Sequence, residues 1–217
     1  MTYDEIKKNK EVCECLKKGN ENLGVLGFTD HSAAHCTMVA KRAAYILKKF
    51  GYSESDIEMV KIAGFMHDIG NVVNRSRHAE YAILANEILK ETDMSLKDRI
   101  TVVSAIGHHD ESTGGATDPI SAALIIADKT DVRRNRVRNK AKENFDIHDR
   151  VNYAVTDAAL KINMDKKVIA LNLQIDTKIC SMYEYFEIFL GRMMMCRGAA
   201  EVLGATFKLT ANGSKVL

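Results

Sequence analysis

Apolar and polar residues follow a helical period over the first two thirds of the chain. Up to about residue 145, apolar residues recur mostly at spacings of three and four, which is typical of amphipathic helices. A helical region is therefore predicted here. The expected helices cover HSAAHCTMVAKRAAYILKKF, IEMVKIAGFMHDIG, RHAEYAILANEILKE, LKDRITVVSAIGHH and PISAALIIADKTDV.

Residues that favour helix ends flank these segments. Gly51 stops the first of them. Ser55 and Glu58 have the spacing of a capping box at the start of the second. Asp118 followed by Pro119 predicts the N-terminus of the last.

The pattern changes after about residue 150. NYAVTDAALKIN and KKVIALNLQI read as two strands joined at MDKK, followed by a helix, MYEYFEIFLGRMMMCRGAAEVLG, and a last strand, ATFKLT. The predicted fold is mainly α, a bundle of about six helices over residues 1–145 with a small α+β extension over residues 146–217.

Composition is ordinary for a globular chain of 217 residues, with 46% hydrophobic and 28% charged residues. A net charge of +2 gives no global reason to expect nucleic acid or a membrane as partner. The longest aliphatic run, AALIIA, is too short to span a bilayer. The chain has five cysteines, an odd number without C-x-x-C spacing, and we interpret them as reduced thiols. A cytoplasmic protein is expected.

Two polar residues interrupt the apolar segment GFMHDIGN, namely His67 and Asp68. Burying this pair without partners costs several kcal/mol, so it needs hydrogen-bonding neighbours or a metal ion. Asp128 poses the same question, because it directly follows the run SAALIIA and should emerge from the core. A structural hydrogen-bonded pair is the alternative for His67 and Asp68.

Six of the seven histidines precede residue 110. His31 and His35 are four residues apart and would project from one helix face, as metal ligands or as an exposed pair. His108 and His109 end an apolar helix, a position that the helix dipole also favours. Together with the carboxylates, these histidines indicate a divalent ion inside a helical bundle, with iron, manganese, zinc and nickel all suited to such ligands.

The order H…HD…H…HH…D resembles the HD-domain metal-dependent phosphohydrolase superfamily over roughly residues 29–140. The resemblance implies that one metal is held by His35, His67, Asp68 and Asp128. For a dinuclear centre, the resemblance implies that Asp68 bridges the two ions and that His78 and His108 are further ligands. It also implies that His31 and His109 bind a third metal or the substrate phosphate.

Two departures from the family pattern bear on the substrate. Asn71 stands where the family often has Lys after HDIG, and DESTGGATDP replaces the G-Y-P signature expected after the paired histidines. These differences count against cleavage of cyclic dinucleotides, though not against phosphoester hydrolysis.

The predicted function is a phosphohydrolase that cleaves a phosphomonoester or phosphodiester, of a nucleotide by preference, with a metal-activated water. Catalytic roles are assigned to Asp68, His109 and Lys129. If the helix continues, Lys129, Arg133 and Arg136 fall near one of its faces and could bind phosphate oxygens. The alternatives for this basic segment, which also includes Lys140 and Lys142, are a solvated helix and a patch that pairs with acidic side chains.

The same residues bear on other partners and functions. Nucleic acid is not expected, because no aromatic residue interleaves with the basic segment. A diiron oxygenase of the same fold and a non-catalytic nucleotide sensor are the alternative functions. The strands of the extension either join a second copy in a homodimer or cover the site.

Overall fold

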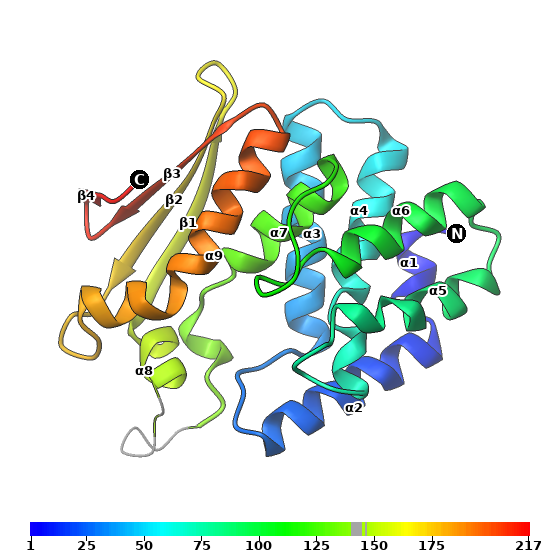
Figure 1. Cartoon of the computed structure of the whole chain (residues 1–217), viewed down its shortest axis with the longest axis horizontal. Coiled ribbons are helices and arrows are strands. Elements are labelled where there is room, and N and C mark those ends of the chain that lie inside the picture. Colours follow the sequence, from blue (N-terminus) through cyan, green and yellow to red (C-terminus); the bar gives the residue numbers. More distant parts are fainter. Residues whose placement is uncertain (140–144, 146) are drawn as a thin grey trace.

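Helices make up most of the computed structural model, which describes residues 1–139, 145 and 147–217 (Figure 1). The mainly helical fold with a small C-terminal α+β part is confirmed. The described α-helices and strands are α1 Tyr3–Ile6, α2 Lys10–Val25, α3 Ala33–Lys49, α4 Glu54–Met66, α5 Ile83–Lys90, α6 Leu96–Gly107, α7 Pro119–Lys129, α8 Ile147–Ala154, β1 Val155–Asn163, β2 Val168–Ile175, α9 Met182–Val202, β3 Thr206–Ala211 and β4 Ser214–Lys215. Short 3₁₀ segments are η1 Ile69–Val72, η2 Glu80–Ala82 and η3 Arg134–Arg136.

Helix α7 is the most buried helix of the bundle. Every residue from Ile120 to Ala127 is buried, as its apolar sequence predicts. Helices α3, α4 and α6 contact it within the bundle, and α9 packs on it from the C-terminal part (Figure 1). Asp128 and Lys129, the last residues of α7, therefore emerge directly from the core.

Two glycines allow close approaches that position the polar residues of the bundle. A Cβ at Gly64 on α4 would overlap the backbone of Ala40 on α3, so glycine lets these two helices touch. A Cβ at Gly70 would overlap the backbone carbonyl of His78. The first contact packs the C-terminal half of α4 against α3, and the second holds η1 against the segment that carries His78.

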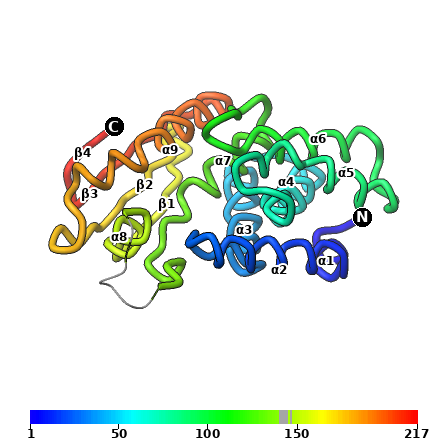
Figure 2. Tube along the Cα trace, turned by 60° about the horizontal axis from the view of Figure 1, so that its bottom comes forward, coloured from blue at the N-terminus to red at the C-terminus, as the bar shows by residue number. Residues whose placement is uncertain are grey.

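The C-terminal sheet has the strand order β1-β2-β3-β4. β1 and β2 form an antiparallel hairpin, whereas β2 and β3 are parallel and are joined across the sheet by α9. Tyr185, Phe189 and Met193 on α9 are buried. Figure 1 and Figure 2 show α9 between the sheet and the helical bundle, and the two termini at opposite ends of the molecule.

Several helix ends differ from the prediction. The capping box of α4 joins Ser53 and Asp56 instead of Ser55 and Glu58, because the helix begins at Glu54. The predicted cap at Asp118 with Pro119 in the first turn of α7 is confirmed, and Asp118 also forms a capping box with Ser121. Helix α7 ends at Lys129, before the predicted end, and the Thr130 hydroxyl there donates to the Ile126 carbonyl.

The start of the C-terminal part also differs. Residues 152–154, predicted as strand, belong to α8, and β1 begins at Val155. The division of the chain at residue 145 stays a prediction, and residue 146 lies outside the described residues. One cluster of buried apolar residues runs from the bundle into the sheet. Within the described part of the chain, no helix is both long enough and apolar enough to cross a membrane.

Candidate metal centre

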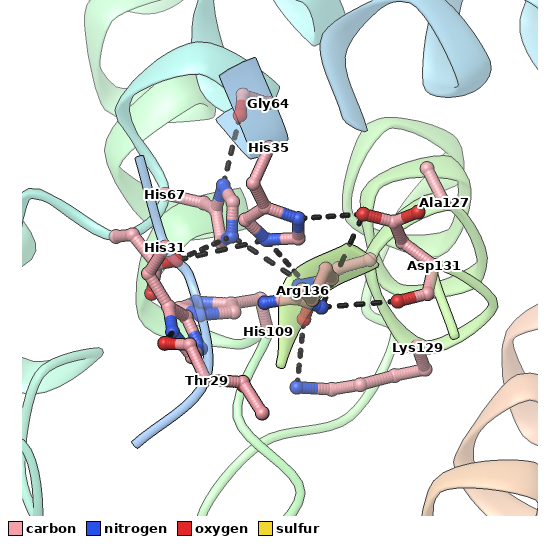
Figure 3. A network of polar contacts seen from close by, with 12 residues as sticks. Thr29, His31, His35, Gly64, His67, His109, Ala127, Lys129, Asp131 and Arg136 are labelled. Atoms are coloured by element: carbon pink, nitrogen blue, oxygen red, sulfur yellow. Dashed lines mark hydrogen bonds and ion pairs between the residues drawn. The ribbon is translucent and has the colours of Figure 1, made fainter. Parts of the chain in front are cut away.

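Histidines and carboxylates from five separate segments of the chain meet in one cluster, in which Figure 3 labels His35, His67 and His109. The cluster, called here the metal centre, is built from the helix ends described above. It comprises His35 on α3, His67 and Asp68 after α4, His78 before η2, His109 after α6 and Asp128 on α7. Apart from Asp128, which is largely covered, each of these side chains is buried.

Two groups of ligand atoms can be distinguished within the metal centre. In the first group, Asp128 Oδ1 lies 3.3 Å from His35 Nε2 and 3.6 Å from His67 Nε2. In the second group, Asp68, His78 and His109 place ligand atoms within 4.8 Å of one another. Each group has the two histidines and one carboxylate that suit a transition-metal ion.

Asp68 faces both groups with different oxygens. Its Oδ2 lies 3.2 Å from His67 Nε2 and 3.7 Å from His35 Nε2, whereas its Oδ1 lies 3.8 Å from His78 Nε2. Asn71 Nδ2 donates to Oδ1 over 2.7 Å and so orients the carboxylate. The bridging position expected for Asp68 is compatible with this geometry.

The hydrogen bonds of the histidines fix their tautomers. Nδ1 of His67, His78 and His109 lies 2.8, 2.9 and 2.6 Å from a backbone carbonyl oxygen, which only accepts, so each Nδ1 carries a proton. His35 Nδ1 is held in the same way, 2.7 Å from Asp131 Oδ2. In its neutral form each of the four rings would therefore present an Nε2 lone pair to the metal centre, as metal-binding histidines do.

Unpaired atoms in the metal centre call for a cation. Within the described chain, His35 Nε2, His67 Nε2 and Asp68 Oδ2 are buried and have no hydrogen-bond partner. His78 Nε2 and His109 Nε2 lie 3.1 Å apart, so two lone pairs would face each other. Because unpaired buried polar groups are costly, the residues fit one or two divalent ions.

The carboxylates favour a positive charge inside the metal centre. Burial would lower the pKa of His67, but the carboxylates of Asp68 and Asp128 raise it to about 10, so without a metal ion this ring carries the positive charge itself. Burial and the neighbouring His67 lower the pKa of His109 to about 3, so its ring is neutral at pH 7. Burial raises the pKa of the adjacent Cys36 well above its usual value, which keeps that thiol protonated.

A further carboxylate, Asp131, supports the metal centre. Its side chain is fully buried, and besides His35 it accepts two hydrogen bonds from Arg133, of 2.5 and 2.9 Å. Such a carboxylate holds a metal-binding ring in place. The sequence predicted neither this role nor the contact, although Asp131 lies only three residues after Asp128.

The basic segment after α7 does not form the predicted continuous helix. Arg133 has an extended backbone and is paired with Asp131. It does not line the cavity into which the metal centre opens. Arg136 does line that cavity, and its guanidinium donates to the backbone carbonyls of Asp30 and Asp131. Lys140 and Lys142 lie outside the described residues.

Two other histidines of the prediction, His31 and His108, take positions that differ from the expected ones. His31 precedes α3, whose N-cap is Ser32, so it does not share a helix face with His35, yet the two ring centroids are 5.6 Å apart. His108 ends α6 and does not line the cavity. The place expected for His108 beside His78 is occupied by His109.

Lys129 links the metal centre to the C-terminal part of the chain. Its ammonium lies 2.9 Å from Asp128 and 2.7 Å from Glu111, and Glu111 also pairs with Arg192 on α9 over 2.9 Å. Burial would lower the pKa of Lys129, but Asp128 and Glu111 raise it. Burial would raise the pKa of Glu111, but Lys129 and Arg192 lower it to about 2. Lys129 and Glu111 are therefore both charged at neutral pH.

The metal centre opens into a cavity of about 300 Å³. Its cationic lining comes from four separate segments: Arg75, Lys129, Arg136 and Arg192. His148 and Asn152 on α8 also line it, so the C-terminal part covers one side. The volume and the convergent polar groups are those of a small-ligand site.

Comparisons with known proteins agree with this arrangement. The model of the HD domain family matches residues 33–136. The chain is 32% identical to the uncharacterized protein MJ1020 of Methanocaldococcus jannaschii over 173 residues, 68% of this chain and 66% of that protein. It is 29% identical to ribonuclease Y of Mycoplasma mycoides over 112 residues, 52% of this chain.

The matched relatives extend beyond the aligned regions. The match spans 25% of the Mycoplasma mycoides ribonuclease Y and 20% of that of Enterococcus faecalis, which is 29% identical over 111 residues. The chain thus spans less than two thirds of these relatives. No solved structure matches the chain significantly.

Proposed function

The chain belongs to the HD-domain family through residues 33–136, and from this premise we propose that it is a metal-dependent phosphohydrolase. The HD domain places it in a superfamily of metal-dependent phosphohydrolases, and the His/Asp cluster fits a metal site. One observation carries the proposal: two groups of ligand atoms share Asp68 and open into a cavity lined with cationic side chains.

The residues divide into two sets of ligands. His35, His67 and Asp128 would hold one divalent ion, His78 and His109 a second, and Asp68 would contact both. Such ions lower the pKa of water and offset charge on phosphoryl oxygens. Asn71 and Asp131 orient Asp68 and His35, so that the ligand atoms are held in place before substrate binds.

The remaining polar residues act on the substrate. Arg75 and Arg136 at the wall of the cavity would bind phosphate oxygens, since guanidinium groups match them in geometry and charge. Lys129, fixed by Asp128 and Glu111, would place a third positive charge at the same end. His109 belongs with the metal ligands in this proposal, and Arg133 supports Asp131 instead of binding phosphate.

A nucleotide or another small phosphoester is the proposed substrate class. The cavity has the size of a small-molecule site. The similarity to ribonuclease Y favours a phosphodiester in RNA as a second candidate. We also propose a cytoplasmic location, because all five cysteines are free thiols, the state that a reducing compartment maintains. Association into a homodimer stays a prediction.

Purified protein reconstituted separately with Mn²⁺, Fe²⁺, Ni²⁺ and Zn²⁺ provides the test. Nucleoside phosphates, 4-nitrophenyl phosphate, bis(4-nitrophenyl) phosphate and a short oligoribonucleotide are offered, and products are measured with and without oxygen. Turnover without oxygen, lost in Asp128→Asn and kept in the exposed Asp165→Asn, supports hydrolysis. The proposal fails if folded, metal-loaded protein cleaves none of these substrates.

A further inference from the structure

Four large apolar side chains are exposed beside the metal centre. Val25, Leu26, Phe28 and Val73 are 89%, 64%, 41% and 51% exposed. They form an apolar shelf that lines a groove of about 590 Å³. Contiguous exposed apolar groups often mark a binding site, and the metal chemistry above does not use these four.

The backbone of the shelf is tied down. The α2 terminus forms a Schellman motif, in which the Phe28 N–H donates to the Leu23 carbonyl over 2.9 Å and the Gly27 N–H to the Gly24 carbonyl over 3.2 Å. Gly27 takes the left-handed conformation that this motif needs, with φ of +83°. Arg138 Nε donates to the Phe28 carbonyl over 3.0 Å. Phe28 is thus presented from a fixed position.

The apolar shelf is continuous with the cavity of the metal centre. Leu26, Phe28 and Arg75 line both the groove and that cavity. Arg75 lies at the junction: its guanidinium carbon is 5.6 Å from the Phe28 ring centroid, and its Nη1 is 3.7 Å from Asp68 Oδ1. One ligand can therefore contact the shelf and the metal centre at once.

We propose that the apolar shelf binds the nucleobase of the substrate, with Phe28 as the stacking residue. This inference rests on the proposed phosphohydrolase function and adds a recognition residue to it. A nucleotide has a flat π-face at one end and phosphate at the other, which matches an exposed aromatic ring on the shelf and cationic side chains at the junction and in the cavity of the metal centre. Asn22, Asn74 and Ser76 line the same groove and offer polar groups to the base edge.

The chemistry at the junction favours a base over an apolar peptide or a second copy of the chain. A peptide would cover the shelf without using the cations of the cavity, whereas a nucleotide uses both. A free nucleotide and a base at the end of an RNA chain share this chemistry, so both are included below.

Tryptophan fluorescence tests base binding apart from catalysis. The chain contains no tryptophan, so Phe28→Trp introduces a single reporter on the shelf. Titration with adenosine 5′-monophosphate should quench it, with Mn²⁺ or with a chelator present, and ribose 5-phosphate should not. Tyr45→Trp, at a site 43% exposed on α3 and away from both cavities, is the matched control and should not respond.

Selectivity for the base is the second readout. The ratio of kcat/KM for adenosine 5′-monophosphate to that for ribose 5-phosphate should fall by about 5- to 20-fold in Phe28→Ala, the lower part of the range for one stacked base, and stay unchanged in Tyr45→Ala. If a short oligoribonucleotide is the better ligand, it replaces the mononucleotide in both readouts.

The two proposals fail in different ways. Quenching by nucleotides without any turnover supports the base site and refutes the hydrolase. Turnover with equal preference for base-free substrates, together with no quenching under either condition, overturns the base site and leaves the hydrolase standing. Equal quenching by ribose 5-phosphate also overturns it. Concentration-dependent association of the native chain that is abolished by Phe28→Ala would assign the shelf to a second copy instead.

Discussion

At the scale of single residues, the orientation of each imidazole determines what the metal centre can hold. In three of the four rings Nδ1 is hydrogen-bonded to a backbone carbonyl, and in the fourth it is hydrogen-bonded to Asp131. Every Nε2 is therefore left to face the metal centre. Asp68 offers one oxygen to each ligand group. Removing Asp68 and removing an outer ligand should therefore have different consequences.

Asp68→Ala should empty both metal positions, whereas His78→Ala should chiefly empty the second. The reason is that Asp68 contacts both groups and His78 only one. Elemental analysis of protein purified in the presence of Mn²⁺ gives the number of ions per chain, with Asp165→Asn as control. Equal loss of metal from both variants would contradict a bridging Asp68.

Asp131→Asn should weaken metal binding by about 10- to 100-fold, as expected for loss of a carboxylate behind a metal-binding histidine. The effect is predicted because Asp131 holds the His35 ring over 2.7 Å. Competition with a chromophoric chelator measures the affinity. In a His35→Ala background the same substitution should have little further effect on affinity, and a full additive loss would show that Asp131 acts only on folding.

The residue pattern of the sequence was informative about ligand identity but not about orientation. The order of histidines and aspartates pointed to His35, His67, Asp68 and Asp128, which the structure brings together. It could not distinguish His108 from His109, because α6 ends at Gly107 and the path of the chain after that point decides which ring turns inward. Asp131 was missed because it is not part of that order, and only the fold shows that it contacts His35, 96 positions away.

At the scale of elements, the spacing of the apolar residues and the capping residues predicted most of the helices and strands. Asp118 and Pro119 start α7, and the two alternating segments form the β1–β2 hairpin. The parallel pairing of β2 with β3 depends on how α9 crosses the sheet between them. The local pattern of apolar and polar residues does not encode that crossing. Glu58, predicted as a cap, instead accepts the Tyr3 N–H over 2.6 Å and pairs with Lys61, thereby fastening α1 to α4.

Glu58→Gln should make stability less sensitive to acid. Burial would raise the pKa of Glu58, but the bonds from Lys61 and Tyr3 outweigh it and lower the pKa below the usual 4.5. A lowered folded-state pKa stabilises the fold above pH 4.5, and this contribution is lost as pH falls through the folded value. Because the side chain is 30% exposed, about 1 kcal/mol is expected.

Urea unfolding followed by circular dichroism between pH 3 and pH 7 measures this contribution. The difference in unfolding free energy between wild type and Glu58→Gln should shrink as the pH decreases. Glu187→Gln, on α9, serves as a control of the same chemistry. A difference independent of pH would mean that the carboxylate charge contributes nothing.

At the scale of the whole molecule, the site is shared between the family domain and the C-terminal part of the chain. Residues 33–136 supply the ligands of the metal centre, while Arg192, His148 and Asn152 close the cavity from α9 and α8. The strands of the extension were expected to cover the site or to join a second copy, but the extension residues that line the cavity lie on the helices α8 and α9, and no sequence signal singled out Arg192. The Glu111 carboxylate pairs with both Lys129 and Arg192 and so joins the two parts beside the cavity that those two residues line.

Arg192→Ala should raise KM for a phosphoester by about 10-fold, since one charge-assisted phosphate contact is worth roughly 1.5 kcal/mol. The matched control is Arg197→Ala on the same helix, whose arginine is 52% exposed, pairs with Glu201 and does not line the cavity. Steady-state kinetics on the best substrate, with unfolding curves of both variants, separates binding from folding. Arg192→Lys should recover part of the affinity, because a positive charge returns without the planar fork of arginine. If both alanine variants change KM equally, α9 affects the site only through packing, and the C-terminal part would be a structural cover that takes no part in substrate recognition.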